Sequence, residues 1–135
     1  MSAERAFLDT NVLLYLLSED AEKAGRAEAL IQAGGVISVQ VLNEFANVAR
    51  RKFAASWDAV HETLDLLKDA LAVEPLTLET HEVALALAER YRFSIYDSLI
   101  LSAALQAGCG VVYSEDLQDG QATGELQIRN PFAGV

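Results

Sequence analysis

The feature that most constrains this chain is a repeated pattern in which a short apolar run breaks into polar residues before a helix-length segment. Residues 6–14, AFLDTNVLL, leave an apolar run at Asp9 and become apolar again at helical spacing. Residues 36–39 precede a helical segment, and residues 110–113 end in an acidic loop. Strands that alternate with helices indicate a parallel sheet covered on both faces. We therefore predict an α/β fold, a three-layer sandwich in which helices flank a mostly parallel central sheet.

Local signals predict the remaining elements. Apolar residues at helical spacing favour helices over 19–32, 40–52, 57–71 and 81–91, and an almost wholly apolar helix that ends near 108. Short strands are expected at 36–39, 72–76, 110–113 and 126–128. The strand with Pro75 suits an edge of the sheet, where proline is tolerated. Ser56 and Thr80 are expected to cap the helices that follow them.

Length and composition predict one compact domain over 1–135, since 135 residues with 52% apolar content can build a full core. No apolar run approaches the roughly 18 residues that a membrane span needs. The first residues lack a signal-peptide pattern, so a cytoplasmic protein is expected. A lone cysteine, Cys109, excludes an internal disulfide and is expected in the core.

The net charge of −10 argues against a passive, nonspecific nucleic-acid binder, which would normally carry a basic surface. It leaves open an enzyme whose acidic site binds divalent cations, and it suits a basic protein partner. Arg50, Arg51 and Lys52 form the only cluster of three bases. They are either a solvated helix end, stabilised by the helix dipole, or a guide for a phosphate backbone.

Four acidic residues occupy comparable places in the predicted fold. Asp9 and Asp116 follow strands, and Glu44 and Asp97 lie in the first turns of helices that follow loops. Three of them have a purely structural explanation: Asp9 and Asp97 could cap helices, and Glu44 could be a solvated surface residue. In a parallel sheet, however, all four point toward one edge, where their mutual repulsion would raise their pKa values unless a cation neutralised them. Oxygen ligands without nearby cysteine or histidine favour Mg²⁺ or Mn²⁺ over zinc.

Four segments, in order along the chain, resemble the motifs of the PIN-domain family, and of its VapC-type toxins in particular. They are Phe7–Leu13 (FLDTNVL), Ser38–Phe45 (SVQVLNEF), Tyr96–Ala104 (YDSLILSAA) and Val112–Leu117 (VYSEDL). The resemblance covers the chain from end to end and implies a single PIN-like domain. It also implies a metal-dependent ribonuclease, the toxin of a type II toxin–antitoxin pair.

The same resemblance implies roles for individual residues. Mg²⁺ or Mn²⁺ would be held, directly or through water, by the catalytic acids Asp9, Glu44, Asp97 and Asp116. Thr10, Asn11 and Ser114 would orient these carboxylates, and the RNA would be cut as an endonuclease does, leaving 5′-phosphate and 3′-hydroxyl ends. Some members of the family place the last acid three residues later, so Asp119 is an alternative fourth acid; Asp116 is favoured because it lies nearer the strand. Glu115 is expected to point outward.

The resemblance further implies a homodimer and a cognate antitoxin whose basic segment enters the acidic groove. Three other interpretations compete with it. A receiver-type phosphoryl-transfer protein would need a lysine where Tyr113 and Ser114 stand. A non-catalytic module of the same fold would bind RNA or a protein without cutting, although all four acidic positions are filled. A purely structural domain leaves the coincidence of the four acids unexplained.

Overall fold

A six-stranded sheet forms the centre of the protein, whose computed structural model describes residues 5–117, 122–124 and 126–134. The strand order is β3-β2-β1-β4-β6-β5. The strands are β1 (Ala6–Leu8), β2 (Val36–Ser38), β3 (Ala72–Glu74), β4 (Val111–Tyr113), β5 (Ala122–Thr123) and β6 (Leu126–Arg129). All neighbouring pairs are parallel except β5 and β6. The predicted mostly parallel sheet is therefore confirmed, and β3, which ends directly before Pro75, lies at its edge.

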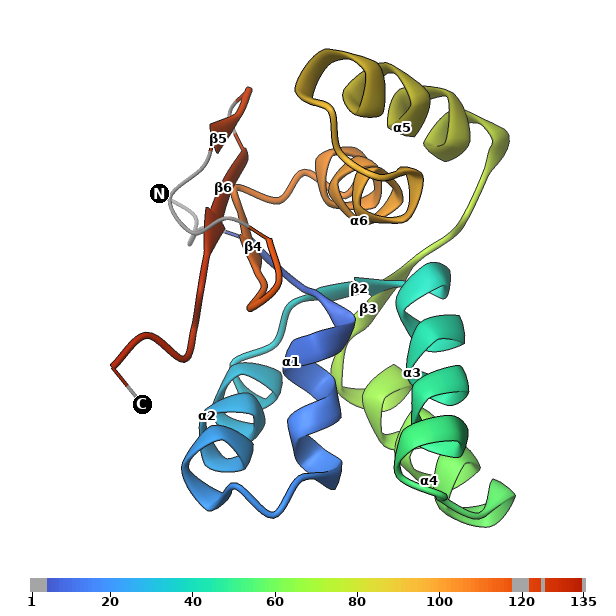
Figure 1. Cartoon of the computed structure of the whole chain (residues 1–135), viewed down its shortest axis with the longest axis vertical. Coiled ribbons are helices and arrows are strands. Elements are labelled where there is room, and N and C mark those ends of the chain that lie inside the picture. Colours follow the sequence, from blue (N-terminus) through green and yellow to red (C-terminus); the bar gives the residue numbers. More distant parts are fainter. Residues whose placement is uncertain (1–4, 118–121, 125, 135) are drawn as a thin grey trace.

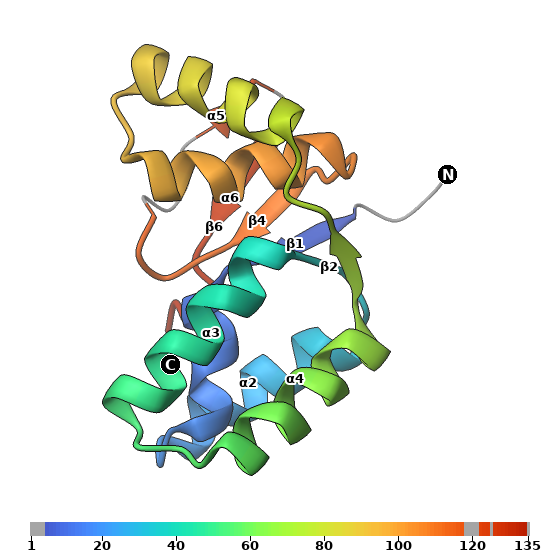
Figure 2. The same ribbon diagram turned by 90° about the vertical axis from the view of Figure 1, so that its right-hand side faces the viewer.

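Helices cover both faces of this sheet. They are α1 (Thr10–Leu14), the 3-10 helix η1 (Tyr15–Leu17), α2 (Ala21–Gln32), α3 (Val39–Lys52), α4 (Trp57–Ala70), α5 (Leu78–Tyr91) and α6 (Ile95–Gln106). Figures 1 and 2 show α5 and α6 on one side of the sheet and α1 to α4 on the other. The predicted three-layer α/β arrangement is thus confirmed. Within the described ranges, no helix has the length and apolarity to cross a bilayer.

The core is built on the central strand and on α6. Phe7 in β1 is fully buried, and Ile100 and Leu101 in α6 are almost fully buried, as the apolar sequence of that helix predicts. Gly35 precedes β2, where an added Cβ would lie 2.9 Å from the backbone oxygen of Ala6, so this close approach of two strands requires glycine. Cys109 is buried, as predicted.

The order of the strands creates a crevice beside β1. From β1 the chain proceeds outward through β2 to β3, then crosses the other face of the sheet to place β4 on the opposite side of β1. Such a reversal, at the carboxyl ends of parallel strands, is where open α/β sheets bind ligands. Asp9 follows β1, and the loop that begins at Ser114 follows β4, so the fold brings these two segments together at that point.

The caps of two helices test the local predictions. Ser56 caps α4 as predicted, since its Oγ accepts a 3.1 Å hydrogen bond from the amide of Ala59. The prediction that Thr80 caps the next helix is wrong. Thr77 is the cap, and Thr80 is a buried residue of the first turn whose hydroxyl donates a 2.9 Å hydrogen bond to Gln106 of α6.

Candidate active site

Asp9 lies at the base of the crevice between β1 and β4. Its backbone amide donates to the carbonyl of Tyr113 at 3.0 Å, which continues the β1–β4 ladder by one residue. Its Oδ1 accepts a 2.7 Å bond from the amide of Thr10 and so caps α1. Its Oδ2 accepts from Ser114 Oγ at 2.9 Å and from Asn11 Nδ2 at 3.2 Å. Capping therefore explains only one of the two oxygens.

The carboxyl of Asp9 is difficult to ionise where it stands. Only 6% of the residue is exposed, and this burial raises its pKa from 3.8 to about 6, although the hydrogen bonds from Ser114 and Thr10 lower it. The negative charges of Glu44 and Asp97 raise the pKa further. No lysine or arginine among the described residues forms an ion pair with Asp9. The ionised carboxylate therefore has hydrogen-bond donors but no compensating charge.

Glu44 reaches the same crevice from α3. Ser38 caps this helix, and buried Val41 and Phe45 fix the face that packs on the core. Glu44 is half-buried beside that face; its Oε1 accepts a 2.9 Å bond from Gln40 Nε2, and its Oε2 accepts a 3.2 Å bond from Thr10 Oγ1. It is therefore not a solvated residue on an outer face. Gln40 was not predicted as its partner, but its position four residues earlier is a signal that could have found it.

Asp97 and Asp116 complete the set of acids. Ser94, not Asp97, caps α6: its Oγ accepts a 3.1 Å hydrogen bond from the amide of Asp97. The carboxylate of Asp97 is thus not used by the cap. Asp116 is exposed on the loop after β4. Asp119, the alternative fourth acid, lies outside the described residues.

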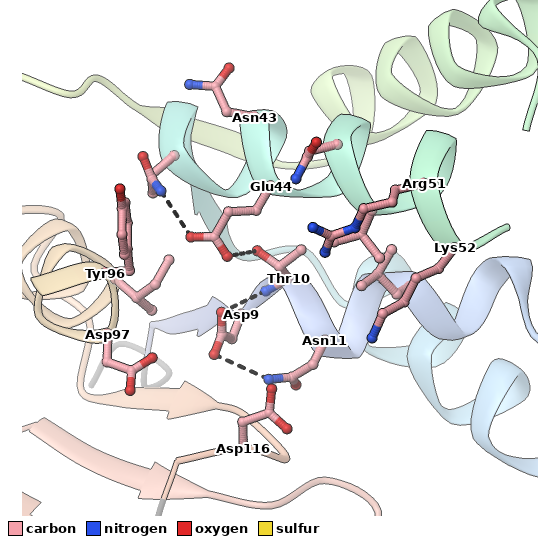
Figure 3. A pocket seen from close by; sticks show the side chains of 15 residues that line it. Asp9, Thr10, Asn11, Asn43, Glu44, Arg51, Lys52, Tyr96, Asp97 and Asp116 are labelled. Atoms are coloured by element: carbon pink, nitrogen blue, oxygen red, sulfur yellow. Dashed lines mark hydrogen bonds between the residues drawn. The ribbon is translucent and has the colours of Figure 1, made fainter. Parts of the chain in front are cut away.

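All four acids line one open groove with a volume of about 740 Å³ (Figure 3). They come from four segments that are far apart in the sequence, as their predicted positions at the carboxyl edge imply. In the part of the chain that the structure describes, no group of three acidic, histidine or cysteine side chains is positioned to hold a metal ion as the side chains stand. The acids thus share a groove without forming a closed cage.

The model of the PIN domain family matches residues 6–119, which include the strands and helices that form this groove. The chain belongs to the PIN-domain family. No curated protein sequence is detectably similar to it.

Solved structures show the same fold. The toxin–antitoxin complex from Klebsiella pneumoniae aligns with a TM-score of 0.72 at 19% identity, covering 94% of this PIN domain and 98% of that chain. VapC20 from Mycobacterium tuberculosis, described as a sarcin–ricin loop cleaving toxin, aligns at 0.67 and 21% identity, covering 82% and 89%. VapBC2 from Rickettsia felis, bound to a DNA fragment from its promoter, aligns at 0.68 and 17% identity, covering 93% and 97%.

The loop after β4 is fastened to the rest of the PIN domain by Glu115. The prediction that Glu115 points outward is wrong. Its Oε2 lies 2.7 Å from Nζ of Lys23, and its Oε1 accepts a hydrogen bond from the hydroxyl of Tyr15. Lys23 also lies 4.9 Å above the ring of Tyr15 and 5.4 Å from that of Phe132. We call Tyr15, Lys23 and Glu115 the loop anchor.

The loop anchor shifts the pKa values of its own members. Burial acts to raise the pKa of Glu115, but hydrogen bonds from Lys23 and Tyr15 outweigh it and hold that pKa below the usual value. The hydrogen bond to Glu115 raises the pKa of both Lys23 and Tyr15. The pair therefore stays ionised at neutral pH. Because the amide of Glu115 donates to Asn11 Oδ1 at 2.9 Å, the anchor is linked to a residue that hydrogen-bonds Asp9.

The three bases at the end of α3 divide into two groups. Arg51 and Lys52 are exposed and line the groove. Arg50 instead donates to the carbonyl of Ala55 at 2.8 Å and lies 4.5 Å from the ring of Trp57. Of the three, therefore, two are placed to meet a ligand in the groove of this PIN domain.

Three further residues with polar side chains line the groove and were not predicted as site residues: Asn43 and Asn47 of α3, and Tyr96 of α6. Asn47 lies three residues after Glu44 and four before Arg51, so it belongs to the same helix row, which is a signal in the sequence. Asn43 lies four residues before Asn47 and borders that row. Tyr96 precedes Asp97, and 68% of it is exposed. An aromatic residue at the start of an apolar helix gave no sign in the sequence that it would be exposed.

Proposed function

We propose that this chain is a divalent-metal-dependent ribonuclease that hydrolyses internal phosphodiester bonds of RNA. The observation that carries the proposal is the shared groove of Asp9, Glu44, Asp97 and Asp116, in which the buried carboxylate of Asp9 has no ion pair with any lysine or arginine that the structure describes. Membership of the PIN-domain family supports the same activity, because its members are nucleases.

The chemistry of the donors fits a hard divalent cation. The groove offers carboxylate oxygens, and no cysteine or histidine is among its lining residues, which favours Mg²⁺ or Mn²⁺. A cation would also supply the charge that ionised Asp9 lacks. Since the acids do not form a closed cage, we propose that some of them act on the ion through water.

Each residue then has a distinct task. Asp9, Glu44, Asp97 and Asp116 would hold the ion, which when bound activates water and stabilises charge on the scissile phosphate. Ser114 and Asn11 hold Oδ2 of Asp9, and Thr10 holds Glu44, so hydrogen bonds fix the carboxylates before a ligand arrives. Arg51 and Lys52 line the groove, and we propose that they bind phosphates of the RNA that flank the cut.

We further propose that the protein is the toxin of a type II toxin–antitoxin pair, that it acts in the cytoplasm and that it forms a homodimer. Several of the structurally similar proteins are described as toxin–antitoxin complexes or VapBC pairs. The net charge of −10 favours an antitoxin whose basic segment enters the acidic groove. Copurification with the product of a neighbouring reading frame would test the partner, and light scattering would test the dimer.

The activity itself is tested with purified protein and a labelled RNA of mixed sequence. We expect cleavage with Mg²⁺ or Mn²⁺, none with EDTA, and loss of cleavage in Asp9→Asn with the fold retained by circular dichroism. Asp69→Asn, an exposed change near the end of α4, is the matched control and should cleave like the parent. Full activity of Asp9→Asn, or equal cleavage in EDTA, would overturn the proposal. RNA binding without any cleavage would favour the non-catalytic module.

A further inference from the structure

The two ends of the groove differ in chemistry. In Figure 3, Tyr96 lies at one end, Arg51 and Lys52 lie at the other, and the carboxylates of Asp9 and Glu44 lie between them. The sequence positions agree with the picture, because Glu44 and Arg51 are seven residues apart on one helix, or about 10 Å along its axis. A strand across the acids would therefore meet cations on one side and an aromatic ring on the other.

Tyr96 is available to a ligand. Its exposed fraction is 68%, and the part of the chain that the structure describes provides it with no hydrogen bond and no ring contact. Neither core packing nor a polar network explains why an aromatic residue should stand there. Exposed rings beside an acidic groove are suited to stacking on flat, apolar faces of nucleobases.

The row of amides on α3 adds donors and acceptors above the acids. The Asn43 and Asn47 side chains are exposed, line the groove and have no hydrogen-bond partner among the described residues. Gln40, by contrast, donates to Glu44. Side-chain amides recognise the edges of bases by paired hydrogen bonds. The amides of Asn43 and Asn47 can therefore form hydrogen bonds with the edge of an unstacked base.

We propose that Tyr96 is the residue on which one base of the RNA stacks, next to Asn43, while Arg51 and Lys52 hold the phosphates that follow. This inference rests on the proposed function and assigns the residues that bind a base and the phosphates of its substrate. In an A-form duplex both faces of each base are covered by neighbouring bases, so the ring of Tyr96 has no face to contact. Because the protein as a whole is acidic, stacking rather than long-range attraction must supply much of the affinity.

The test uses a fluorescent RNA oligonucleotide of mixed sequence, single-stranded or annealed to its complement, with Mg²⁺ and in an Asp9→Asn background so that the RNA survives. Anisotropy should show tighter binding of the single strand. Tyr96→Ala should weaken that binding by roughly five- to hundredfold, while Tyr96→Phe, which keeps the ring, should bind within about twofold of the parent. Duplex binding should not respond to either change. Trp57→Ala removes another exposed aromatic, one outside the groove, and should have no effect on the single strand.

The cationic end is tested through salt. Two phosphate contacts on a single strand predict a slope of about −1.4 for the logarithm of affinity against that of salt concentration. The double variant Arg51→Met, Lys52→Met should bring this slope close to zero, and Arg50→Met should leave it unchanged because Arg50 lies against Trp57.

Several results would overturn the inference. They are equal binding of duplex and single strand, unchanged binding in Tyr96→Ala, and a change of oligomeric state in Tyr96→Ala, which would assign the ring to a protein contact. Cleavage by the parent separates this inference from the proposed function. If the parent cleaves RNA and Tyr96→Ala has the parent's KM, only the stacking is wrong. If ring-dependent binding occurs without cleavage by the parent, only the nuclease activity is wrong.

Discussion

Nζ of Lys23 lies 2.7 Å from Oε2 of Glu115, although 92 positions separate the two residues in the sequence. The contact joins α2 to the loop that carries Ser114 and Asp116. Through the amide of Glu115 and the side chain of Asn11, it continues to Oδ2 of Asp9. A charge pair outside the groove thus helps to set the geometry of the acids inside it.

Replacing Lys23 with methionine should therefore slow cleavage while the protein stays folded. The variant leaves Glu115 with Tyr15 alone, so the loop loses a fixed position and Ser114 and Asp116 move relative to Asp9. We expect cleavage to slow by roughly tenfold, the lower range for residues that orient metal-binding side chains. Lys68→Met is the matched control, since Lys68 forms an exposed pair with Asp65 on α4. Equal activity of Lys23→Met and the parent would contradict the role of the loop anchor.

Ser114→Ala should shift the pH dependence of cleavage. The hydrogen bond from Ser114 lowers the pKa of Asp9, so its loss raises that pKa, and the ascending limb of the pH–rate profile should move to higher pH. The loss of activity should be larger at pH 6 than at pH 8. Ser102→Ala removes a buried hydroxyl that donates to the carbonyl of Thr80 and does not line the groove. That control should lower the melting temperature without moving the profile.

Asp9 should make the metal-free protein less stable at neutral pH than in mild acid. Its folded pKa of about 6 lies above the ordinary value of 3.8, so between these values the folded state binds more protons than the unfolded state. The free energy of unfolding should therefore fall by about 3 kcal/mol as pH rises through this window. Asp9→Asn should remove this fall and be the more stable protein at pH 8 in EDTA.

Denaturant titrations at pH 4 and pH 8 measure this difference directly. Adding Mg²⁺ at pH 8 should stabilise the parent and have a much smaller effect on Asp9→Asn, because binding to the folded state alone raises stability. If Asp9→Asn is less stable than the parent at pH 8 in EDTA, groups within the protein already stabilise the charge of the Asp9 carboxylate.

The fourth acid can be assigned by comparing two matched substitutions. Asp116 lines the groove with the other three acids, so Asp116→Asn should slow cleavage by roughly 10- to 100-fold. Asp119→Asn should retain most of the activity. The rates are measured at a fixed, subsaturating Mg²⁺ concentration, where a lost ligand has its largest effect. The reverse order of the two variants would assign the role to Asp119.

The sequence was sufficient to predict the parts of the site that depend on chain direction. Parallel strands share one carboxyl edge, so the positions of Asp9 after β1 and of Asp116 after β4 follow from strand–helix alternation alone. Glu44 follows for a related reason, because α3 begins directly at the end of β2. Their metal-binding and catalytic roles remain predictions.

The parts that were predicted wrongly depend on how helices rotate and pack. Thr77 and Thr80 are both able to cap α5, and the burial of Thr80 against Gln106 decides between them. Glu115 was expected to face solvent because nothing in the sequence indicates that α2 turns Lys23 toward it. Such pairings between distant segments are set by tertiary packing, which local patterns do not encode.

The strand order also has a consequence for synthesis. The hydroxyl that holds Asp9 belongs to a residue 105 positions later, and β1 has β4 as one of its two neighbours in the sheet. While the chain is still emerging from the ribosome, Asp9 therefore lacks its hydrogen bond from Ser114, and β1 lacks β4 as its second neighbour. A nascent chain shorter than about 116 residues lacks Asp116 and cannot assemble the groove, so the proposed active site stays incomplete on the ribosome until translation is nearly over.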